Sequence, residues 1–520
     1  MNIPFQNIQN IPQLIKDFLH QDISTFEKLK FSIDQAFKHA EIKEKSFLPQ
    51  QREVLCSVLQ EQHSSLELSE KQKENLKLLE DPRTFTVVTG HQLNLFSGPV
   101  FFVYKILQTI KTAALLSEKS TNKKFIPIFW MATEDHDFEE INHFRTENNL
   151  FQIKAKSGGP VGRIAIEEND FLEEFENVFK DEVYGTELIL WMKEAYRKGN
   201  TLSEATRILV NRLFGSWGLL MIDGDDARLK QSMESIFLDE LKNQSLKEST
   251  KKTVASLEEK YGKVQVNPRD INLFYLSETR DRIEAHGEHY RVIDTDLEFS
   301  LQEVQKQIPH LSPNALMRPV YQEKILPNIA YIGGNAEIAY WLELKNYFEK
   351  LYLPFPILIP RNSLLFLKEK TIKKIEKTGL HIEDFFGDYA QVMREKLLDN
   401  SEISSILNQK QKEIKEAFSV LKSKAEITDK TFKNLVEAEE TRQLKSYTRM
   451  QKRLLRAEKI KQNEKYTYLQ QLFLEVHPSG TWQERLYNFS VFYAQNGRQW
   501  LNACYEKIDV EKSALIISEI

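Results

Sequence analysis

The stretch that decides the fold is FTVVTGHQLNLFSGPVFFVYKILQTIKTAALL, residues 85–116. It begins with a β-rich apolar run, continues through a polar loop bounded by glycines, and is expected to become a helix at about Val100. Short apolar runs also alternate with amphipathic helices further along the chain, at FIPIFWMA (125–132), GLLMID (218–223) and PILIP (356–360). This alternation is typical of a parallel sheet wrapped by helices and predicts an α/β fold.

The regions around these strands predict a helical preface and several insertions. Residues 1–84 are interpreted as an N-terminal helical segment, because apolar positions recur at intervals of three and four in IPQLIKDFLH and FEKLKFSIDQAF. The runs GRIAIEE (162–168) and YRVIDTD (290–296) fit further strands, which we expect in insertions and not in the central sheet. The α/β core with its insertions is therefore predicted to span 85–387.

A long helical hairpin is predicted for 388–477, a densely charged stretch without Gly or Pro in which apolar residues recur at helical spacing. The segment AEITDK (425–430) marks a turn, where Thr428 or Asp429 would cap a second helix. An arm of this length cannot bury both faces in a compact domain, so we expect it to project or to meet a partner chain. Residues 478–520 are apolar and aromatic enough to pack back on the core.

The composition restricts the class of protein. The 520 residues are 41% hydrophobic, which is enough for at least one large core. The net charge of −5 provides no general field for nucleic acid. Because the sequence has no apolar run of roughly 18 to 20 residues and no signal peptide at its start, we expect a cytoplasmic protein that binds neither nucleic acid nor membrane. Cys56 and Cys504 lie far apart and are expected to be reduced thiols.

The first candidate site is the loop in VVTGHQLNLFSGP (87–99), between the first clear strand and the helix that follows. Gly90 allows close approach of a ligand, and His91, Gln92 and Asn94 add polar side chains at the carboxyl end of the strand. Free amides at the start of the following helix would suit a phosphate or a carboxylate. The alternative is a tight connection between strand and helix with no ligand.

The second candidate site is FWMATEDHDFEEINH (129–143), where an apolar strand runs directly into four polar residues. These are Glu134, Asp135, His136 and Asp137. Carboxylates beside an imidazole can orient a substrate ammonium, act as a general base or bind a divalent ion. His136, Glu140 and His143 would share one helical face if a helix began early, although the spacing differs from HExxH and we expect no metal in the site. The alternative is an acidic helix N-terminus stabilised by the helix dipole.

The third candidate site lies in 314–345 and would form a second wall of a cleft. Arg318 offers a planar guanidinium to a carboxylate or phosphate, and Gly333 and Gly334 form a turn before a helix. That helix carries Glu337 and Tyr340. The alternative is a surface ion pair at Arg318 and a plain Gly-Gly loop.

Two weaker candidates lie nearer the C-terminus. Arg361, Asn362 and Ser363 follow the predicted strand 356–360 and so lie at another strand end. The basic helix between Arg442 and Lys465 contains Arg449 and Arg453, which could bind a nucleotide phosphate, and Arg485 follows the arm. A solvated helix face would explain the same basic residues.

Three of these motifs, in order, resemble one protein family. They are TGHQLNLFSGP (89–99), PIFWMATEDHDFEEINH (127–143) and ALMRPVYQEKILPNIAYIGGNAEIAYWLELK (315–345), and they resemble the BshC family of bacillithiol biosynthesis, a family of cysteine-adding enzymes. The resemblance implies a Rossmann-like core of the nucleotidyltransferase type with inserted connecting segments, a projecting coiled coil, and a homodimer. It also implies a ligase that adds L-cysteine to glucosaminyl-malate. The chain carries neither the HxGH nor the KMSKS signature of class I synthetases.

The chemistry of such a ligase assigns roles to the candidate residues. A carboxylate must be activated before it acylates an amine at neutral pH, and ATP is the expected source, through an acyl phosphate or an acyl adenylate. The site then requires donors for anions, an acid for the cysteine ammonium and a base for the sugar amine. The hypothesis assigns anion binding to His91, Gln92 and Asn94, ammonium recognition to Asp135 and Asp137, proton transfer to His136, and the malyl group to Arg318.

Two other functions remain open from the sequence. One is a non-catalytic nucleotide-binding scaffold whose helical arm recruits a partner. The other is a metal-dependent hydrolase built on the acidic cluster at 134–143. The ligase hypothesis requires His91 and the acids at 135 and 137 to converge on a single pocket.

Overall fold

The structure of the protein, a computed structural model, describes residues 1–20, 26, 29–155, 158–167, 171–399, 401–425 and 427–519. The chain divides into two compact units. The first consists of Met1–Gln6, Ile11–Leu365 and Gln483–Ser518, and the second consists mainly of Phe366–Trp482. Each unit is described by itself.

The centre of the first unit is a five-stranded parallel sheet with the order β13-β12-β2-β3-β6. Its strands are β2 (Thr84–His91), β3 (Lys124–Met131), β6 (Leu220–Asp223), β12 (Asn328–Gly333) and β13 (Ile357–Pro360). The chain builds β2, β3 and β6 outward on one side and then returns to add β12 and β13 on the other. The strand order therefore reverses between β2 and β12, which makes this pair a topological switch point.

Strands β2, β3, β6 and β13 confirm four predicted runs, and the parallel sheet confirms the predicted α/β class. Two other predictions need correction. The central strand β12 was not predicted. The expected strand at 162–168 is wrong for its described part, where Val161–Arg163 form a 3-10 turn and Ala165 makes only an isolated bridge with Thr201; residue 168 lies outside the described residues.

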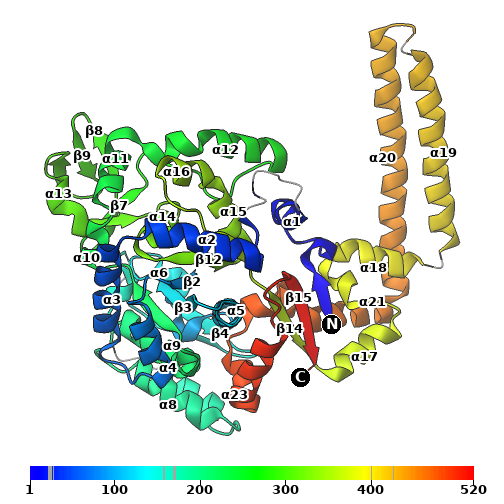
Figure 1. The fold of residues 1–520 in the computed structure, drawn as a ribbon. Helices are drawn as coiled ribbons and strands as arrows, with labels where there is room; N and C mark the ends of the chain where they lie inside the picture. The colour runs from blue at the N-terminus through cyan, green and yellow to red at the C-terminus, as the bar shows by residue number, and fades with distance from the viewer. Residues whose placement is uncertain are drawn as a thin grey trace. The chain divides into compact units, whose positions relative to one another are not determined.

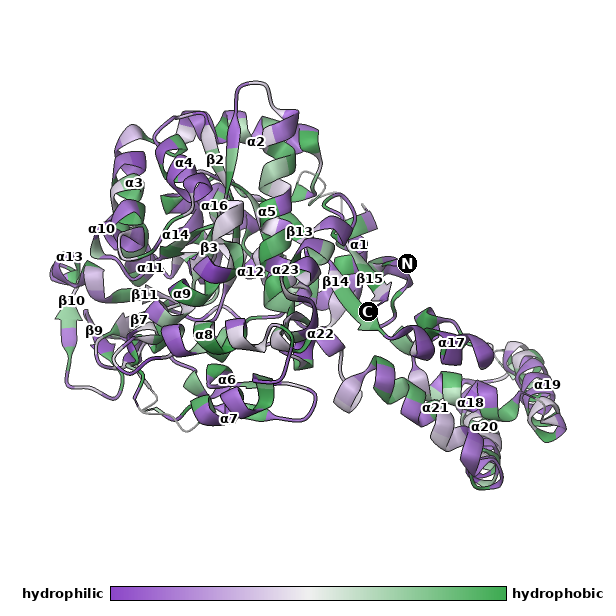
Figure 2. Cartoon of the chain, turned by 90° about the horizontal axis from the view of Figure 1, so that it is seen from below, coloured by the Kyte–Doolittle hydropathy of each residue, from purple (hydrophilic) through white to green (hydrophobic). Residues whose placement is uncertain are grey.

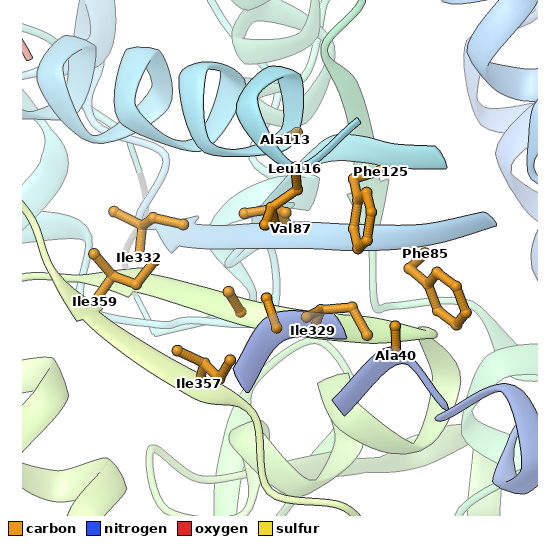
Figure 3. Close-up of a cluster of buried hydrophobic side chains, with 12 residues drawn as sticks. Ala40, Phe85, Val87, Ala113, Leu116, Phe125, Ile329, Ile332, Ile357 and Ile359 are labelled. Atoms are coloured by element: carbon orange, nitrogen blue, oxygen red, sulfur yellow. The ribbon is translucent and has the colours of Figure 1, made fainter. Parts of the chain in front are cut away.

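Helices α2 (Ile33–Ser46) and α5 (Phe101–Lys119) pack against the sheet through one apolar cluster. Figure 3 shows Val87, Ile332 and Ile359 from three strands gathered with Leu116 of α5 and Ala40 of α2. Helix α5 connects β2 to β3, as the quoted stretch predicts. Protein interiors are packed as tightly as crystals, so this cluster holds the strands rigidly. The ends of the strands therefore point in a fixed direction.

Further helices surround this sheet in the first unit. They are α1 (Gln13–His20), α3 (Pro49–His63), α4 (Glu70–Leu78), α6 (Phe138–Ile141), α7 (Phe171–Phe179), α8 (Gly185–Ala195), α9 (Leu202–Phe214), α10 (Ala227–Gln231), α11 (Glu234–Asn243), α12 (Ser245–Tyr261), α13 (Val304–Gln307), α14 (Arg318–Ile325), α15 (Asn335–Glu343), α16 (Lys345–Lys350), α22 (Gln483–Leu486) and α23 (Ser490–Lys507). The helices α1 to α4 confirm the predicted helical preface.

Smaller sheets are inserted between these elements or join the termini. An antiparallel sheet has the order β10-β9-β8-β7-β11 and consists of β7 (Leu273–Leu276), β8 (Arg280–His286), β9 (His289–Val292), β10 (Glu298–Ser300) and β11 (Leu311–Pro313). It confirms a strand near 290 in an insertion. The hairpin β4 (His143–Arg145) and β5 (Leu150–Gln152) follows β3, and β1 (Asn2–Pro4), β15 (Ala514–Glu519) and β14 (Ser363–Leu367) form a third sheet. The last two strands are mainly hydrophobic in Figure 2.

The second unit contains the predicted helical hairpin. Helices α19 (Glu402–Ala425) and α20 (Lys430–Lys461) lie side by side in Figure 1. Asp429 caps α20 by accepting a hydrogen bond from the amide of Phe432 at 2.8 Å, so the predicted turn and cap are confirmed. Helices α17 (Glu369–Lys377), α18 (Tyr389–Leu398) and α21 (Asn463–Val476) complete this unit's helices among the described residues. No helix in the described parts of either unit has both the length and the apolarity to cross a lipid bilayer.

Candidate active site

A cavity of about 470 Å³ opens where strands β2, β3 and β12 end. Its wall is formed by the end of β2, the segment after β3 and the first turn of α15, together with Arg280 of β8 and residues 313–315. This place is the switch point of the sheet, where open α/β sheets bind ligands. The prediction that loops after neighbouring strands converge on one pocket is confirmed for His91 and Asp135, which both line it, and is wrong for Asp137, which does not.

Residues from all three sequence motifs reach this cavity. The candidates that line it are Gly90, His91, Gln92, Glu134, Asp135, Arg318, Gly334, Glu337, Tyr340 and Arg485. Other candidates lie outside its wall, namely Asn94, His136, Asp137, Gly333 and Asn362. Arg449 and Arg453 are exposed on α20, in the second unit.

Asn94 lies outside the wall because the loop after β2 turns away from the cavity. Phe96, Ser97 and Gly98 all have positive φ angles, of 47°, 68° and 62°. The Nδ2 atom of Asn488 donates to the carbonyls of Phe96 and Gly98, each at 2.7 Å, and holds this strained turn. Asn94 is buried against the turn. A Cβ atom added to Gly98 would lie only 2.6 Å from the Cβ atom of Asn94.

At each of the two predicted backbone cradles for an anion, the protein itself already uses one amide. At the start of α5, the amide of Val100 donates to the carbonyl of Tyr487 at 2.7 Å. At the start of α15, the amide of Gly334 donates to Glu337 Oε2 at 3.0 Å. These two amides are therefore not available to an anionic ligand.

Asn362 and Asp137 have other surroundings. Asn362 is buried; its Nδ2 donates to the carbonyl of Lys512 and its Oδ1 accepts from the amide of Asp509, so it holds the C-terminal segment. Asp137 is exposed at the start of α6. The proposed metal-binding face is also wrong, because α6 is a short helix from Phe138 to Ile141 and His143 already belongs to β4. The described residues contain no group of three or more His, Cys, Asp or Glu side chains arranged to hold a metal.

Asp135 is held in place by its neighbours. Its Oδ2 accepts from Gln92 Nε2 at 2.8 Å and its Oδ1 accepts from the amide of His136 at 2.8 Å. The adjacent Glu134 pairs with the buried Lys230 at 2.7 Å. These contacts fix an anionic carboxylate in the wall, where a ligand ammonium can reach it.

His136 contacts Arg280 and does not line the cavity. Its Nδ1 lies 3.2 Å from Arg280 Nη1. Arginine can only donate, so this ring nitrogen accepts, and the neutral ring carries its proton on Nε2. Burial and the Arg280 charge lower the pKa of His136. The lone pair that a general base needs is therefore already occupied.

His91 is in a different state. Its ring stacks on Phe102 with centroids 5.2 Å apart and meets the edge of Phe101 at the same distance. Burial lowers its pKa well below the usual value, and the charges of Lys105 and Arg361 lower it further, so His91 is neutral at pH 7. The Nε2 atom is buried and has no hydrogen-bond partner among the described residues.

Arg318 is a cation enclosed by aromatic rings. Its guanidinium carbon lies 6.0 Å from the ring centroid of Trp130, 5.5 Å from that of Tyr331 and 5.8 Å from that of Trp341. Its Nη1 donates to Gln322 Oε1 at 2.9 Å. No carboxylate of the described residues lies within 4 Å of this guanidinium. A largely desolvated charge with no carboxylate in direct contact is costly, so the site is suited to an anionic ligand.

The ends of β2 and β12 are joined by a buried ion pair that the sequence did not reveal. Lys105 Nζ donates to Glu337 Oε1 at 2.7 Å and to the carbonyl of Gly90 at 2.5 Å. Glu337 Oε2 in turn accepts from the amide of Gly334. The pair therefore spans the switch point from α5 to α15.

The wall contains further cations, of which Arg280 was missed by the sequence analysis and Arg361 was one of its weaker candidates. Arg280 donates to Ser312 Oγ and to the carbonyl of Pro313, and so attaches the inserted sheet to the cavity. Arg361 forms a bidentate pair with Glu484. Together with Lys105, Arg318 and Arg485, these residues make the wall rich in positive charge. Such a wall binds carboxylates and phosphates.

Comparison with known families accounts for nearly the whole chain. Residues 1–362 match the model described as "Bacillithiol biosynthesis BshC, N-terminal Rossmann-like domain". Residues 364–519 match "Bacillithiol biosynthesis BshC, C-terminal coiled-coil domain". The Rossmann-like fold and the coiled coil implied by the sequence resemblance are thereby confirmed.

Similar proteins come from several bacteria and carry the printed name "Putative cysteine ligase BshC". The protein of Flavobacterium johnsoniae is 37% identical over 514 residues, which cover 97% of each chain. That of Christiangramia forsetii is 38% identical over 95% of this chain and 94% of its own. That of Flavobacterium psychrophilum is 38% identical over 97% of both. The chain therefore belongs to the bacillithiol biosynthesis BshC family.

Proposed function

We propose that the cavity at the switch point joins the carboxyl group of L-cysteine to the amine of glucosaminyl-malate, which forms bacillithiol. The relatives' printed name supports a cysteine ligase, and the family description supports bacillithiol synthesis. The observation that carries the proposal is Arg318, a half-buried cation that lines the cavity without a carboxylate partner among the described residues. Of the two substrates, glucosaminyl-malate supplies the dicarboxylate that such a site requires.

We assign each part of the substrates to residues of the wall. Arg318 binds a carboxylate of the malyl group, with the hydroxyls of Tyr331 and Tyr340 each 3.4 Å from its Nη2. Asp135 binds the ammonium of cysteine, since its carboxylate faces the cavity and is oriented by Gln92. Arg280 lies close to Asp135 and offers a cation to the carboxyl group of the same amino acid.

Activation of the cysteine carboxyl group requires a leaving group, and we propose that ATP supplies it. The donor set fits phosphate, because Lys105, Arg361 and Arg485 all line the same cavity as His91. When bound, ATP provides the energy for the amide bond. The same proposal includes a core of the nucleotidyltransferase type and a homodimer formed through the coiled coil. The homodimer is supported by exposed apolar side chains on the hairpin, such as Leu421 and Leu435.

The test is a reconstituted reaction. Purified protein is mixed with glucosaminyl-malate, cysteine and ATP, and the product is identified by mass together with ADP or AMP. We expect product from the natural sequence and a loss of at least about 100-fold in kcat/KM for Arg318→Met, because a charged hydrogen-bonding partner is removed. Arg83→Met, at an exposed arginine paired with Asp81, is the control.

Two results would contradict the proposal, the first its ligase activity and the second its binding site. Nucleotide binding without any joined product would support the nucleotide-binding scaffold instead. Product formation at the normal rate by Arg318→Met would show that the malyl group binds elsewhere.

A further inference from the structure

The reaction needs a group that takes a proton from the amine, and the two histidines near the cavity differ in their ability to do so. We infer that His91, and not His136, is the proton acceptor of the amide-forming step. This inference rests on the proposed function. It changes the role that the sequence suggested for each histidine.

The first step of the argument is the availability of a lone pair. On His136 the acceptor atom Nδ1 is already occupied by Arg280 Nη1 at 3.2 Å, and the other nitrogen carries the proton. His136 also lies outside the cavity wall. On His91, neither ring nitrogen has a hydrogen-bond partner among the described residues, so the lone pair of the neutral ring is free, and the residue lines the cavity. A polar ring in the wall without a partner is costly, so a donor from the substrate would be stabilised by the free lone pair of His91.

The second step concerns the surroundings that keep His91 neutral. Phe101 and Phe102 cover the ring, and every charged group that acts strongly on it is positive: Lys105 from α5 and Arg361 after β13. The imidazole therefore does not take up a proton before the reaction begins. The two phenyl rings fix the orientation of the imidazole. The base is therefore positioned without a hydrogen bond from its ring to a carboxylate.

The third step is the balance of the reaction. The amine nitrogen forms a bond to the activated carbonyl carbon of cysteine, and the C–O bond to the phosphate leaving group breaks. The electron pair of that bond leaves with the phosphate. The nitrogen becomes much more acidic as the C–N bond forms, so a weak, neutral base is sufficient to accept its proton. The same cations that keep His91 neutral, Lys105 and Arg361, stabilise the negative charge of the leaving phosphate.

The test compares three variants of the full-length chain in the reaction with glucosaminyl-malate, cysteine and ATP. His91→Ala leaves a space beside the cavity, His91→Asn keeps a polar side chain that accepts no proton, and His136→Asn keeps an acceptor for Arg280. We expect both His91 variants to lose roughly 10²- to 10⁴-fold in kcat with KM within a few-fold, as for loss of a general base. Added imidazole should restore activity to His91→Ala and not to His136→Asn.

The rescue also has a distinctive pH dependence. In the rescued His91→Ala variant, activity should fall at low pH with the pKa of free imidazole, whereas the natural enzyme should lack this acid limb. Circular dichroism confirms that each variant is folded.

The outcomes separate this inference from the proposed function. No product from the natural sequence would contradict the ligase itself. Product from the natural sequence, together with a normal rate in His91→Asn or with no imidazole rescue of His91→Ala, would contradict only the assignment of His91. Imidazole rescue of His136→Asn would identify His136 as the base instead.

Discussion

The buried pair of Lys105 and Glu337 gives the sharpest prediction of stability. It joins α5 to α15 across the switch point at 2.7 Å, with side-chain exposures of 1% and 26%. Lys105→Met removes the cation and leaves Glu337 partly hydrated. Glu337→Gln removes the anion and leaves Lys105 in an almost fully buried position, with Gly90 as its remaining acceptor.

The magnitudes follow from this difference in exposure. Removing one partner of a buried ion pair costs about 3–5 kcal/mol in the free energy of unfolding, because an uncompensated charge is left behind. We expect Lys105→Met near the lower end, since water reaches Glu337, and Glu337→Gln near the upper end. The double variant should be less destabilised than the sum of the single variants by about 2–3 kcal/mol.

A pH dependence follows for Glu337→Gln. Burial lowers the pKa of Lys105, and the Glu337 charge opposes this lowering in the natural sequence. Without Glu337, the unfolded state binds more protons than the folded state as the pH rises toward the ordinary lysine pKa. The stability of this variant should therefore increase from pH 7 to pH 9.

The assay is unfolding by urea, followed by tryptophan fluorescence, for the four proteins of the cycle. The second unit can unfold separately, so the transition of the first unit is fitted on its own. The reasoning would be refuted if the effects of the two single variants on the free energy of unfolding simply added in the double variant. It would also be refuted if each single variant lost less than about 1 kcal/mol in that free energy.

Three further predictions concern other buried polar groups. His63 accepts a hydrogen bond from the amide of Met221, and burial lowers the pKa of His63 to about 4. The free energy of unfolding should therefore fall by up to ~3 kcal/mol as the pH falls from about 6.5 to 4. In His63→Gln, the free energy of unfolding should fall less steeply over the same pH range. Asn488→Ala frees the two carbonyls of the strained turn and should cost about 2–3 kcal/mol in chemical denaturation; an unchanged midpoint would contradict this. Gln451 forms a polar layer in the hairpin with Asn408, and Gln451→Leu should leave the melting temperature unchanged or raise it, since buried polar groups fix register more than stability; a fall of several degrees would argue otherwise.

The sequence predicted most strands of the central sheet because each is a short apolar run. The strand β12 (Asn328–Gly333) was missed although NIAYIG is also such a run. An apolar run directly before a helix fits either a strand or the start of that helix, and periodicity alone does not decide between them. The converse error occurred at 162–168, where alternation suggested a strand. Alternation does not provide a partner strand, and there only Ala165 forms a bridge.

The sequence predicted where the site lies, but it predicted only some of the residues that line it. Strand ends indicated the correct edge of the sheet, because parallel strands end together. Side-chain direction was not predictable: Asp135 faces the cavity, whereas Asp137, two residues further along, is exposed. Lys105 resembled any lysine on an amphipathic helix until packing placed it against β2. Arg280 is 144 residues from His136 in the chain, so only the fold brings them together.

The most direct test of the central claim is a crystal structure of the protein with glucosaminyl-malate bound. We predict that a malyl carboxylate contacts Arg318 and that the sugar amine lies within hydrogen-bonding distance of a ring nitrogen of His91. Glucosaminyl-malate bound elsewhere on the protein, with the cavity at the ends of β2, β3 and β12 empty, would contradict the account.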